Sequence, residues 1–146
     1  MRERAGVLII RKGRVALIER HWRGRHYWAI PGGKVKSGET IADAALREAE
    51  EELGVPVDLG ALRVRIDHRA ENASIQRQWY FEATVQSDDT HVVGPEVDNQ
   101  QRGTYRAVWV GLDDLDVEAT YPLAVARLLA QQNGEWPSHV VEIDET

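Results

Sequence analysis

The segment from Gly33 to Val55 constrains the fold and chemistry of this chain more than any other part of its 146 residues. It reads GKVKSGETIADAALREAEEELGV, a glycine-containing stretch followed by a run with the apolar spacing of an amphipathic helix. On a helix from about Ile41 to Leu53, Glu48, Glu51 and Glu52 share one face because residues three and four apart are neighbours. Carboxylates so close repel one another unless a cation lies among them, and Mg²⁺ suits such oxygen ligands. The pattern predicts a Mg²⁺ site, with Mn²⁺ as an alternative ion, on the acidic face of a helix.

The residues that flank the helix decide between a metal site and an ordinary solvent-exposed acidic face. A run of glutamates on a helix is more often a solvated face. Here Gly32 and Gly33 follow Pro31, which predicts a tight, permissive backbone loop just before the helix. Thr40 is expected to cap the start of the helix and Gly54 its end. A glycine loop beside clustered carboxylates favours ligand binding.

The spacing of these residues resembles the Nudix box, the signature of the Nudix hydrolase superfamily. Gly33, Glu39 and the run from Arg47 to Val55 match its fixed positions. Ala49 is a soft departure, where the family prefers a bulky aliphatic residue. The resemblance implies an α/β fold, a Nudix-type α/β/α sandwich with a mixed β-sheet, and we expect one domain over residues 1–146.

The resemblance also implies distinct roles for the box residues. Glu48 or Glu52 would remove a proton from the attacking water, and the sequence leaves that choice open. Arg47 would pair with Glu39 and orient the helix against the loop, although an ordinary surface ion pair is the alternative. The implied metal ligands are the backbone carbonyl of Gly32 and the carboxylates of Glu48, Glu51 and Glu52.

A further metal ligand is expected outside the box, because many Nudix enzymes recruit one more glutamate. Residues 86–102 are rich in Ser, Asp, Gly, Pro and Asn, which predicts a long loop, and long loops are often functional. Glu96 lies in this loop beside Gly94 and Pro95 and is the candidate. A solvent-exposed loop acid is the alternative interpretation.

Cations and aromatic residues near the glycine loop are candidates for substrate binding. The segment from Arg20 to His26 holds three Arg and two His and no acid, which suits phosphate groups or, alternatively, a solvated hairpin tip. Aromatic side chains at strand positions can stack on a base or fill a core. The predicted substrate-binding residues are Arg20, Arg23, Arg25, Tyr27, Trp28 and Trp79.

The remaining pattern predicts strands interrupted by two helices, which is typical of a mixed sheet covered on both faces. The segment from Trp136 onward is left unassigned. Apart from the helix at 41–53 and the loop at 86–102, the expected elements are strands at 5–10, 15–19, 27–30, 57–68, 75–85 and 104–110, a helical turn at 112–115 and a helix at 122–132.

Composition limits the functional classes that remain. The chain has no Cys, which excludes disulfides and thiolate chemistry, and no apolar stretch long enough to cross a bilayer. It shows no signal peptide, so we expect a cytoplasmic protein without a membrane partner. A net charge of −6 argues against nucleic acid as a partner. A small nucleoside diphosphate-type substrate is expected, and a homodimer is left open.

The expected reaction is attack of water on a phosphorus of a diphosphate linkage, without a covalent intermediate. A nucleoside triphosphate pyrophosphohydrolase is the favoured reading. A nucleotide-sugar or other diphosphate hydrolase is an alternative, and RNA 5′-end pyrophosphohydrolysis would favour a basic groove that the composition does not suggest. A non-catalytic nucleotide-sensing module is a further alternative, but such modules commonly lose box carboxylates, and all are present here.

Overall fold

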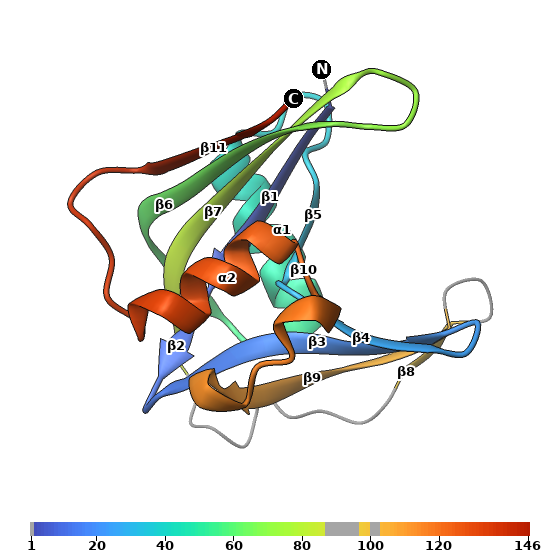
Figure 1. The fold of residues 1–146 in the computed structure, drawn as a ribbon, viewed down its shortest axis with the longest axis vertical. Helices are drawn as coiled ribbons and strands as arrows, with labels where there is room; N and C mark the ends of the chain where they lie inside the picture. The colour runs from blue at the N-terminus through green and yellow to red at the C-terminus, as the bar shows by residue number, and fades with distance from the viewer. Residues whose placement is uncertain (1, 87–96, 100–102) are drawn as a thin grey trace.

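The computed structural model describes residues 2–86, 97–99 and 103–146, which form two β-sheets and two α-helices (Figure 1). The first sheet has the strand order β11-β6-β7-β1-β5, and the second has the order β10-β4-β3-β9-β8, with β2 paired to β3. The first sheet is mixed, because β1 is parallel to β7 and β11 is parallel to β6, while β6–β7 and β1–β5 are antiparallel. Its strands are β1 (Arg2–Leu8), β5 (Gly32–Lys34), β6 (Val57–Arg69), β7 (Ile75–Val85) and β11 (Val141–Glu145). The strands of the second sheet are β2 (Ile10–Arg11), β3 (Arg14–Trp22), β4 (Arg25–Ala29), β8 (Val97–Asn99), β9 (Gly103–Gly111) and β10 (Thr120–Tyr121).

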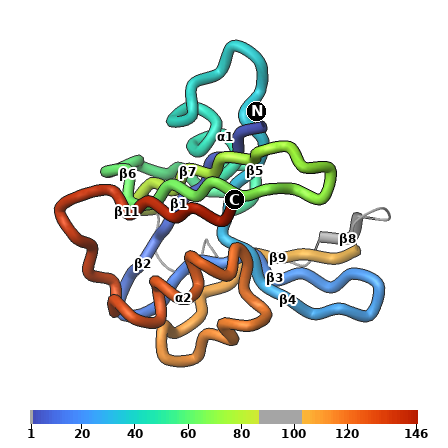
Figure 2. Tube along the Cα trace, turned by 45° about the horizontal axis from the view of Figure 1, so that its top comes forward, coloured from blue at the N-terminus to red at the C-terminus, as the bar shows by residue number. Residues whose placement is uncertain are grey.

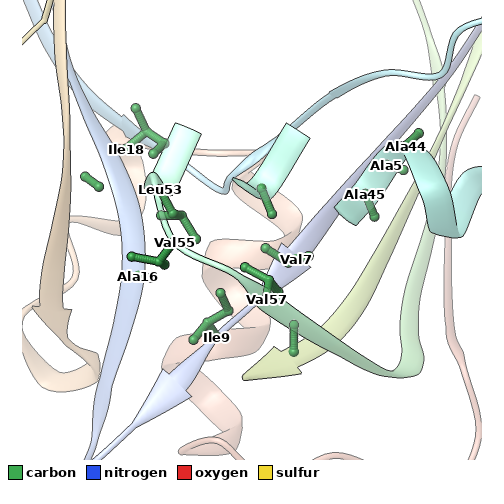
Figure 3. Close-up of a cluster of buried hydrophobic side chains, with 13 residues drawn as sticks. Ala5, Val7, Ile9, Ala16, Ile18, Ala44, Ala45, Leu53, Val55 and Val57 are labelled. Carbon is green, nitrogen blue, oxygen red and sulfur yellow. The ribbon is translucent and has the colours of Figure 1, made fainter. Parts of the chain in front are cut away.

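Each helix covers an apolar cluster formed by both sheets. Helix α1 (Ile41–Leu53) packs on Ala5 and Val7 of β1, whereas Leu8 points to the cluster under α2 (Leu123–Gln132). This division follows from the alternation of side chains along a strand. Figure 3 shows the α1 cluster, and in Figure 2 the two helices lie on opposite sides of the first sheet. The predicted α/β/α sandwich is confirmed, with two sheets where one mixed sheet was expected.

The box helix has the bounds that its local sequence predicts. The Oγ1 atom of Thr40 accepts a hydrogen bond from the backbone N–H of Asp43 at 3.0 Å. At the other end Gly54 adopts a left-handed conformation with φ of 72°, and its N–H donates to the carbonyl oxygen of Glu50 at 2.9 Å. A side chain with a Cβ adopts this conformation only at a cost, which is why glycine ends the helix here.

Several segments differ from the sequence prediction or extend it. Gly32 and Gly33, predicted to lie in a loop, form strand β5, and the strand predicted at 5–10 is divided into β1 and β2. Strand β8 lies inside the span predicted as a long loop, and Glu96 lies outside the described residues. Helix α2 begins one residue later than predicted, with Pro122 before its first turn. Strand β11 lies in the unassigned tail, where it pairs with β6. Neither of the two described helices has the length and apolarity needed to span a bilayer.

Candidate active site

The two glycines before the box helix bring its acidic face against the first sheet. They belong to β5, which pairs with β1. The backbone N–H of Gly32 donates to Oε1 of Glu52 at 2.9 Å. A Cβ added to Gly33 would lie 2.5 Å from Oε2 and 2.6 Å from Oε1 of Glu48, closer than real Cβ atoms approach. Glycine is therefore needed here because the backbone and the Glu48 carboxylate touch.

Glu48 and Glu52 line a cavity of about 460 Å³ whose other walls are mostly cationic. Four cationic side chains face these two carboxylates, so the cavity is locally positive although the chain carries a net charge of −6. Only Arg20 among the four was predicted. Lys34 follows the glycines directly in the sequence, so its place beside them could have been inferred. Arg4 reaches the cavity only because β1 pairs with β5 and β7. The remaining lining residues are Arg4, Arg20, Lys34, Lys36 and Tyr105, with Gly32 and Gly33.

Arg47 ties the box helix to the segment before it. Its Nε and Nη2 atoms donate to the two carboxylate oxygens of Glu39 at 2.7 and 2.9 Å. Nη1 donates to Glu48 at 2.8 Å and Nη2 to the carbonyl oxygen of Lys34 at 3.1 Å. The bonds from Arg47, together with the backbone N–H of Lys36, lower the pKa of Glu39 to about 2. A single guanidinium thus orients Glu48 and fixes the chain on both sides of it.

Replacing Arg47 with Lys is expected to lower turnover about 10- to 100-fold, the range found when residues that orient metal ligands are changed. An ammonium group cannot donate simultaneously to Glu39, Glu48 and the Lys34 carbonyl in this geometry. Glu48 would then lose the bond that orients it. Steady-state kinetics and thermal melting check this expectation.

Arg63→Lys is the matched control. Arg63 donates through Nε and Nη2 to Glu82 at 2.9 and 2.6 Å and does not line the cavity. Its replacement should lower the melting temperature without lowering turnover. Equal turnover losses in the two variants would contradict an orienting role for Arg47.

The surroundings of Glu52 raise its pKa, in contrast to those of Glu39. Burial raises its pKa to about 7, and the nearby Glu48 adds to the rise. The Gly32 N–H and the positive charges of Arg20 and Arg4 act in the opposite direction. The guanidinium of Arg20 lies 3.6 Å from Oε2 of Glu52 and 5.3 Å from the centre of the Tyr105 ring. Burial outweighs these cations, so near neutral pH Glu52 is divided between its two protonation states.

The three box carboxylates do not converge as a ready-made metal cluster. Among the described residues no group of three His, Asp or Glu side chains is arranged to hold an ion. Glu51 is exposed and does not line this cavity, and its Oε2 lies 3.6 Å from Nη1 of Arg47, the atom that also donates to Glu48. Mg²⁺ is commonly bound by one or two carboxylates together with waters and substrate phosphates. The pair Glu48 and Glu52 fits that mode of binding.

Two of the predicted substrate-binding residues line a second cavity of about 280 Å³ next to the first. These are Arg20 and Tyr27, and this cavity shares Arg4, Gly32 and Glu52 with the first. The Tyr27 ring packs edge-on against Tyr121 at a centroid distance of 5.8 Å. Arg25 donates to the Tyr121 hydroxyl at 3.3 Å. Tyr121 was not predicted, because nothing in the sequence brings residue 121 next to β4.

The other four predicted residues, Arg25 among them, lie outside these two cavities. Arg23 is at the tip of the β3–β4 hairpin, where its guanidinium lies 4.6 Å from the Trp22 ring centre. Trp28 packs against the apolar cluster under α2. Trp79 donates through Nε1 to Glu3 at 2.7 Å. It alternates with Tyr80 along β7 and therefore points to the other face of the first sheet.

Comparisons with known proteins show the family of this chain. Among curated relatives, Nucleoside diphosphate-linked moiety X motif 6 of Mus musculus is 29% identical over 120 residues, covering 80% of this chain and 37% of that protein. The Oxidized purine nucleoside triphosphate hydrolase of Danio rerio is 47% identical over 53 residues, covering 36% of this chain and 34% of that protein. The chain spans 19% and 37% of the length of the first two curated relatives.

Solved structures show the same fold. A MutT NUDIX hydrolase from Burkholderia pseudomallei is similar with a TM-score of 0.66 and 30% identity, over 90% of this chain and 96% of that chain. A NUDIX hydrolase from Nitrosomonas europaea has a TM-score of 0.72 and 19% identity, over 99% and 79% of the two chains. The NUDIX domain family model matches residues 1–132. The chain therefore belongs to the Nudix hydrolase family, which acts on pyrophosphate bonds of nucleoside diphosphate derivatives and generally uses divalent metal cations.

Proposed function

We propose that this chain hydrolyses a nucleoside triphosphate to a nucleoside monophosphate and pyrophosphate with the aid of Mg²⁺. The observation that carries the proposal is the first cavity, in which Glu48 and Glu52 face Arg4, Arg20, Lys34 and Lys36. A nucleoside triphosphate carries more negative charge than a nucleotide sugar, and it matches a site with an excess of cations. The Danio rerio relative is named as a hydrolase of oxidized purine nucleoside triphosphates, which supports the same choice.

Glu48 and Glu52 would hold the metal ion in this proposal, and Glu51 would join them only after leaving Arg47. The ion would neutralise charge on the phosphate oxygens and acidify a bound water. Arg47 keeps the Glu48 carboxylate in place through the 2.8 Å bond to Nη1. The cations on the other walls would bind the remaining phosphate oxygens and orient the chain of phosphates across the cavity.

Glu52 is the residue that we assign as proton acceptor. Burial raises the pKa of Glu52 to about 7 before an ion binds, and a bound cation would lower it, so Glu52 would accept the proton through the carboxylate oxygen that the ion leaves free. Glu48 is the weaker candidate, because its Oε1 already accepts a hydrogen bond from Nη1 of Arg47 at 2.8 Å. The choice that the sequence left open thus falls on Glu52.

A substrate panel tests the proposal. We expect pyrophosphate release from nucleoside triphosphates in Mg²⁺ and none in excess chelator. Nucleotide sugars, dinucleoside polyphosphates and 5′-triphosphorylated RNA should be turned over at least about tenfold more slowly, as differential transition-state binding requires. Faster cleavage of a nucleotide sugar would move the assignment to that class. Nucleotide binding without any hydrolysis would instead indicate a sensing module.

A further inference from the structure

A third cavity, of about 440 Å³, continues from the proposed phosphate site along the first sheet. Arg4 lines all three cavities, and this one reaches from Arg4 to the turn before α2. One wall is formed by side chains on the α2-facing side of β1, β6 and β7, and the other by Tyr121, Pro122 and Leu123. The wall residues that matter below are Arg4, Gln76, Gln78 and Tyr80, with His68 and Glu145 at the rim.

A one-way chain of hydrogen bonds runs along the sheet wall. The Tyr80 hydroxyl donates to Oε1 of Gln78 at 2.6 Å, and Nε2 of Gln78 donates to Oε1 of Gln76 at 2.9 Å. Tyr80 is 5% exposed, and burial raises its pKa, so the phenol keeps its proton and donates it. The phenolic oxygen can also accept, so the direction of the chain follows from the amide orientations in the structure, with Oε1 of Gln78 at the Tyr80 hydroxyl and its Nε2 at Gln76. Nε2 of Gln76, at the end of the chain, has no partner among the described residues.

Arg4 adds further N–H donors between these amides and the proposed phosphate site. It lies opposite Gln78 in the pairing of β1 with β7. Its guanidinium is partly exposed and makes no hydrogen bond or ion pair with any residue that the structure describes. Arg4, Gln78 and Gln76 therefore present N–H groups to the cavity, whereas the acceptor at the rim, Glu145, lies 3.3 Å from Nδ1 of His68.

The opposite wall suits a flat ring. Tyr121 is 41% exposed, and no other large hydrophobic side chain is as exposed in the described part of the chain. Its ring is braced by Tyr27 and by Arg25. Pro122 and Leu123 continue this apolar wall. A base stacked on Tyr121 would direct one edge at the amide wall, while its phosphates extend past Arg4 to Glu48 and Glu52.

We propose that this cavity binds the base of the substrate nucleotide and selects keto bases over amino bases, an inference that rests on the proposed function. Guanine, hypoxanthine, uracil and thymine carry an exocyclic carbonyl oxygen that accepts from the Gln76 and Gln78 N–H groups. Adenine and cytosine carry an amino group at the equivalent position. With these bases the amino N–H groups would face the N–H groups of Gln76 and Gln78. A buried donor without an acceptor costs about tenfold or more in affinity.

Binding of nucleoside monophosphates tests this without hydrolysis. Titration calorimetry in chelator compares IMP with AMP and UMP with CMP, so that the members of each pair differ in the keto or amino group and the adjoining ring N–H. We expect the keto member of each pair to bind about tenfold more tightly. Equal affinity within both pairs, or no binding of any of the four, would overturn the inference. A keto preference without hydrolysis of any triphosphate would refute the proposed function and leave the base site standing.

Gln78→Glu supplies the sharper test. The new carboxylate would accept from both Tyr80 and the Gln76 amide, so the Gln76 carbonyl oxygen would turn into the cavity. The preference should then shift by about tenfold or more toward AMP and CMP. Gln131→Glu on the exposed side of α2 adds the same charge outside the cavity and should leave the ratios unchanged. Tyr80→Phe removes the first donor and should reduce the preference, and unchanged ratios in both Gln78→Glu and Tyr80→Phe would refute the mechanism.

Discussion

Glu52→Gln is expected to reduce kcat for Mg²⁺-dependent hydrolysis by about 10³-fold, the effect of removing a general base. An amide cannot take a proton from water and is a poorer ligand for Mg²⁺ than a carboxylate. The backbone N–H of Gly32 can still donate to the amide oxygen, so the loop should keep its position. Steady-state kinetics at saturating Mg²⁺ and a Mg²⁺ titration measure the two losses separately.

The same substitution is expected to stabilise the metal-free protein at alkaline pH. Burial raises the pKa of Glu52 from its ordinary 4.5 to about 7, so the folded state binds more protons than the unfolded state between these values. Stability therefore falls as pH rises through this window, and the full cost is present above pH 7. A neutral glutamine side chain at position 52 does not carry this cost of burying a charge. The free energy of unfolding of Glu52→Gln at pH 8 should exceed that of the wild type by up to about 3 kcal/mol, since one pKa unit is about 1.4 kcal/mol.

Denaturant unfolding in chelator at pH 8 and pH 5 checks this difference, which should shrink towards pH 4.5. Glu50→Gln is the matched control, because Glu50 lies on the same helix and is exposed, and its Oε2 accepts from the Val57 N–H at 3.0 Å. This control should change neither turnover nor the pH dependence of stability. A Glu52→Gln protein that is no more stable than the wild type at pH 8 would show that burial does not penalise the carboxylate.

Gly33→Ala is the second substitution with a large expected effect. The new methyl group would lie 2.5 Å from Oε2 of Glu48, so the carboxylate or the strand has to move. Overpacking of this kind costs about 1–3 kcal/mol of stability. A displacement of about 1 Å at a catalytic group lowers turnover about 10²-fold. Thermal unfolding and steady-state kinetics measure the two effects.

Truncation of Glu48 tests whether the stability lost in Gly33→Ala comes from contact with the Glu48 carboxylate. In the background of Glu48→Ala the methyl group at residue 33 has room, so Gly33→Ala should cost little additional stability. The double-mutant cycle should give a coupling energy of about 1 kcal/mol or more between the two positions. Additive effects would mean that the glycine serves the backbone conformation of β5 and not the approach of Glu48.

Local signals explain why the box helix was predicted correctly from the sequence. Thr40, Gly54 and the apolar spacing act within a few residues of one another, so the helix ends at its predicted residues. The Arg47–Glu39 pair was likewise predicted, from the resemblance, and the structure shows it. Glu51 was assigned to the metal site because helix geometry places it near Glu48. Its carboxylate lies 3.6 Å from Nη1 of Arg47, which also donates to Glu48, and its role as a metal ligand stays a prediction.

Within the cationic wall of the site, Arg4 could not be predicted, because its position depends on pairing between strands distant in sequence. Arg4 enters the cavity through the pairing of β1 with β5 and β7. Trp79 was predicted to bind substrate because it is aromatic, but alternation along a strand does not say which face a ligand occupies. Its neighbour Tyr80 lies on the cavity side.

The last strand of the first sheet, β11, lies beyond residue 132, where the match to the family model ends. It covers the free edge of β6 and brings Glu145 to the rim of the third cavity. Part of the wall that would contact a bound base is thus built by a tail that family membership does not specify. Homologues with a shared catalytic box but a different segment after residue 132 can therefore diverge in ligand preference without any change to the hydrolytic centre. A fusion tag placed after residue 146 would lie beside this wall.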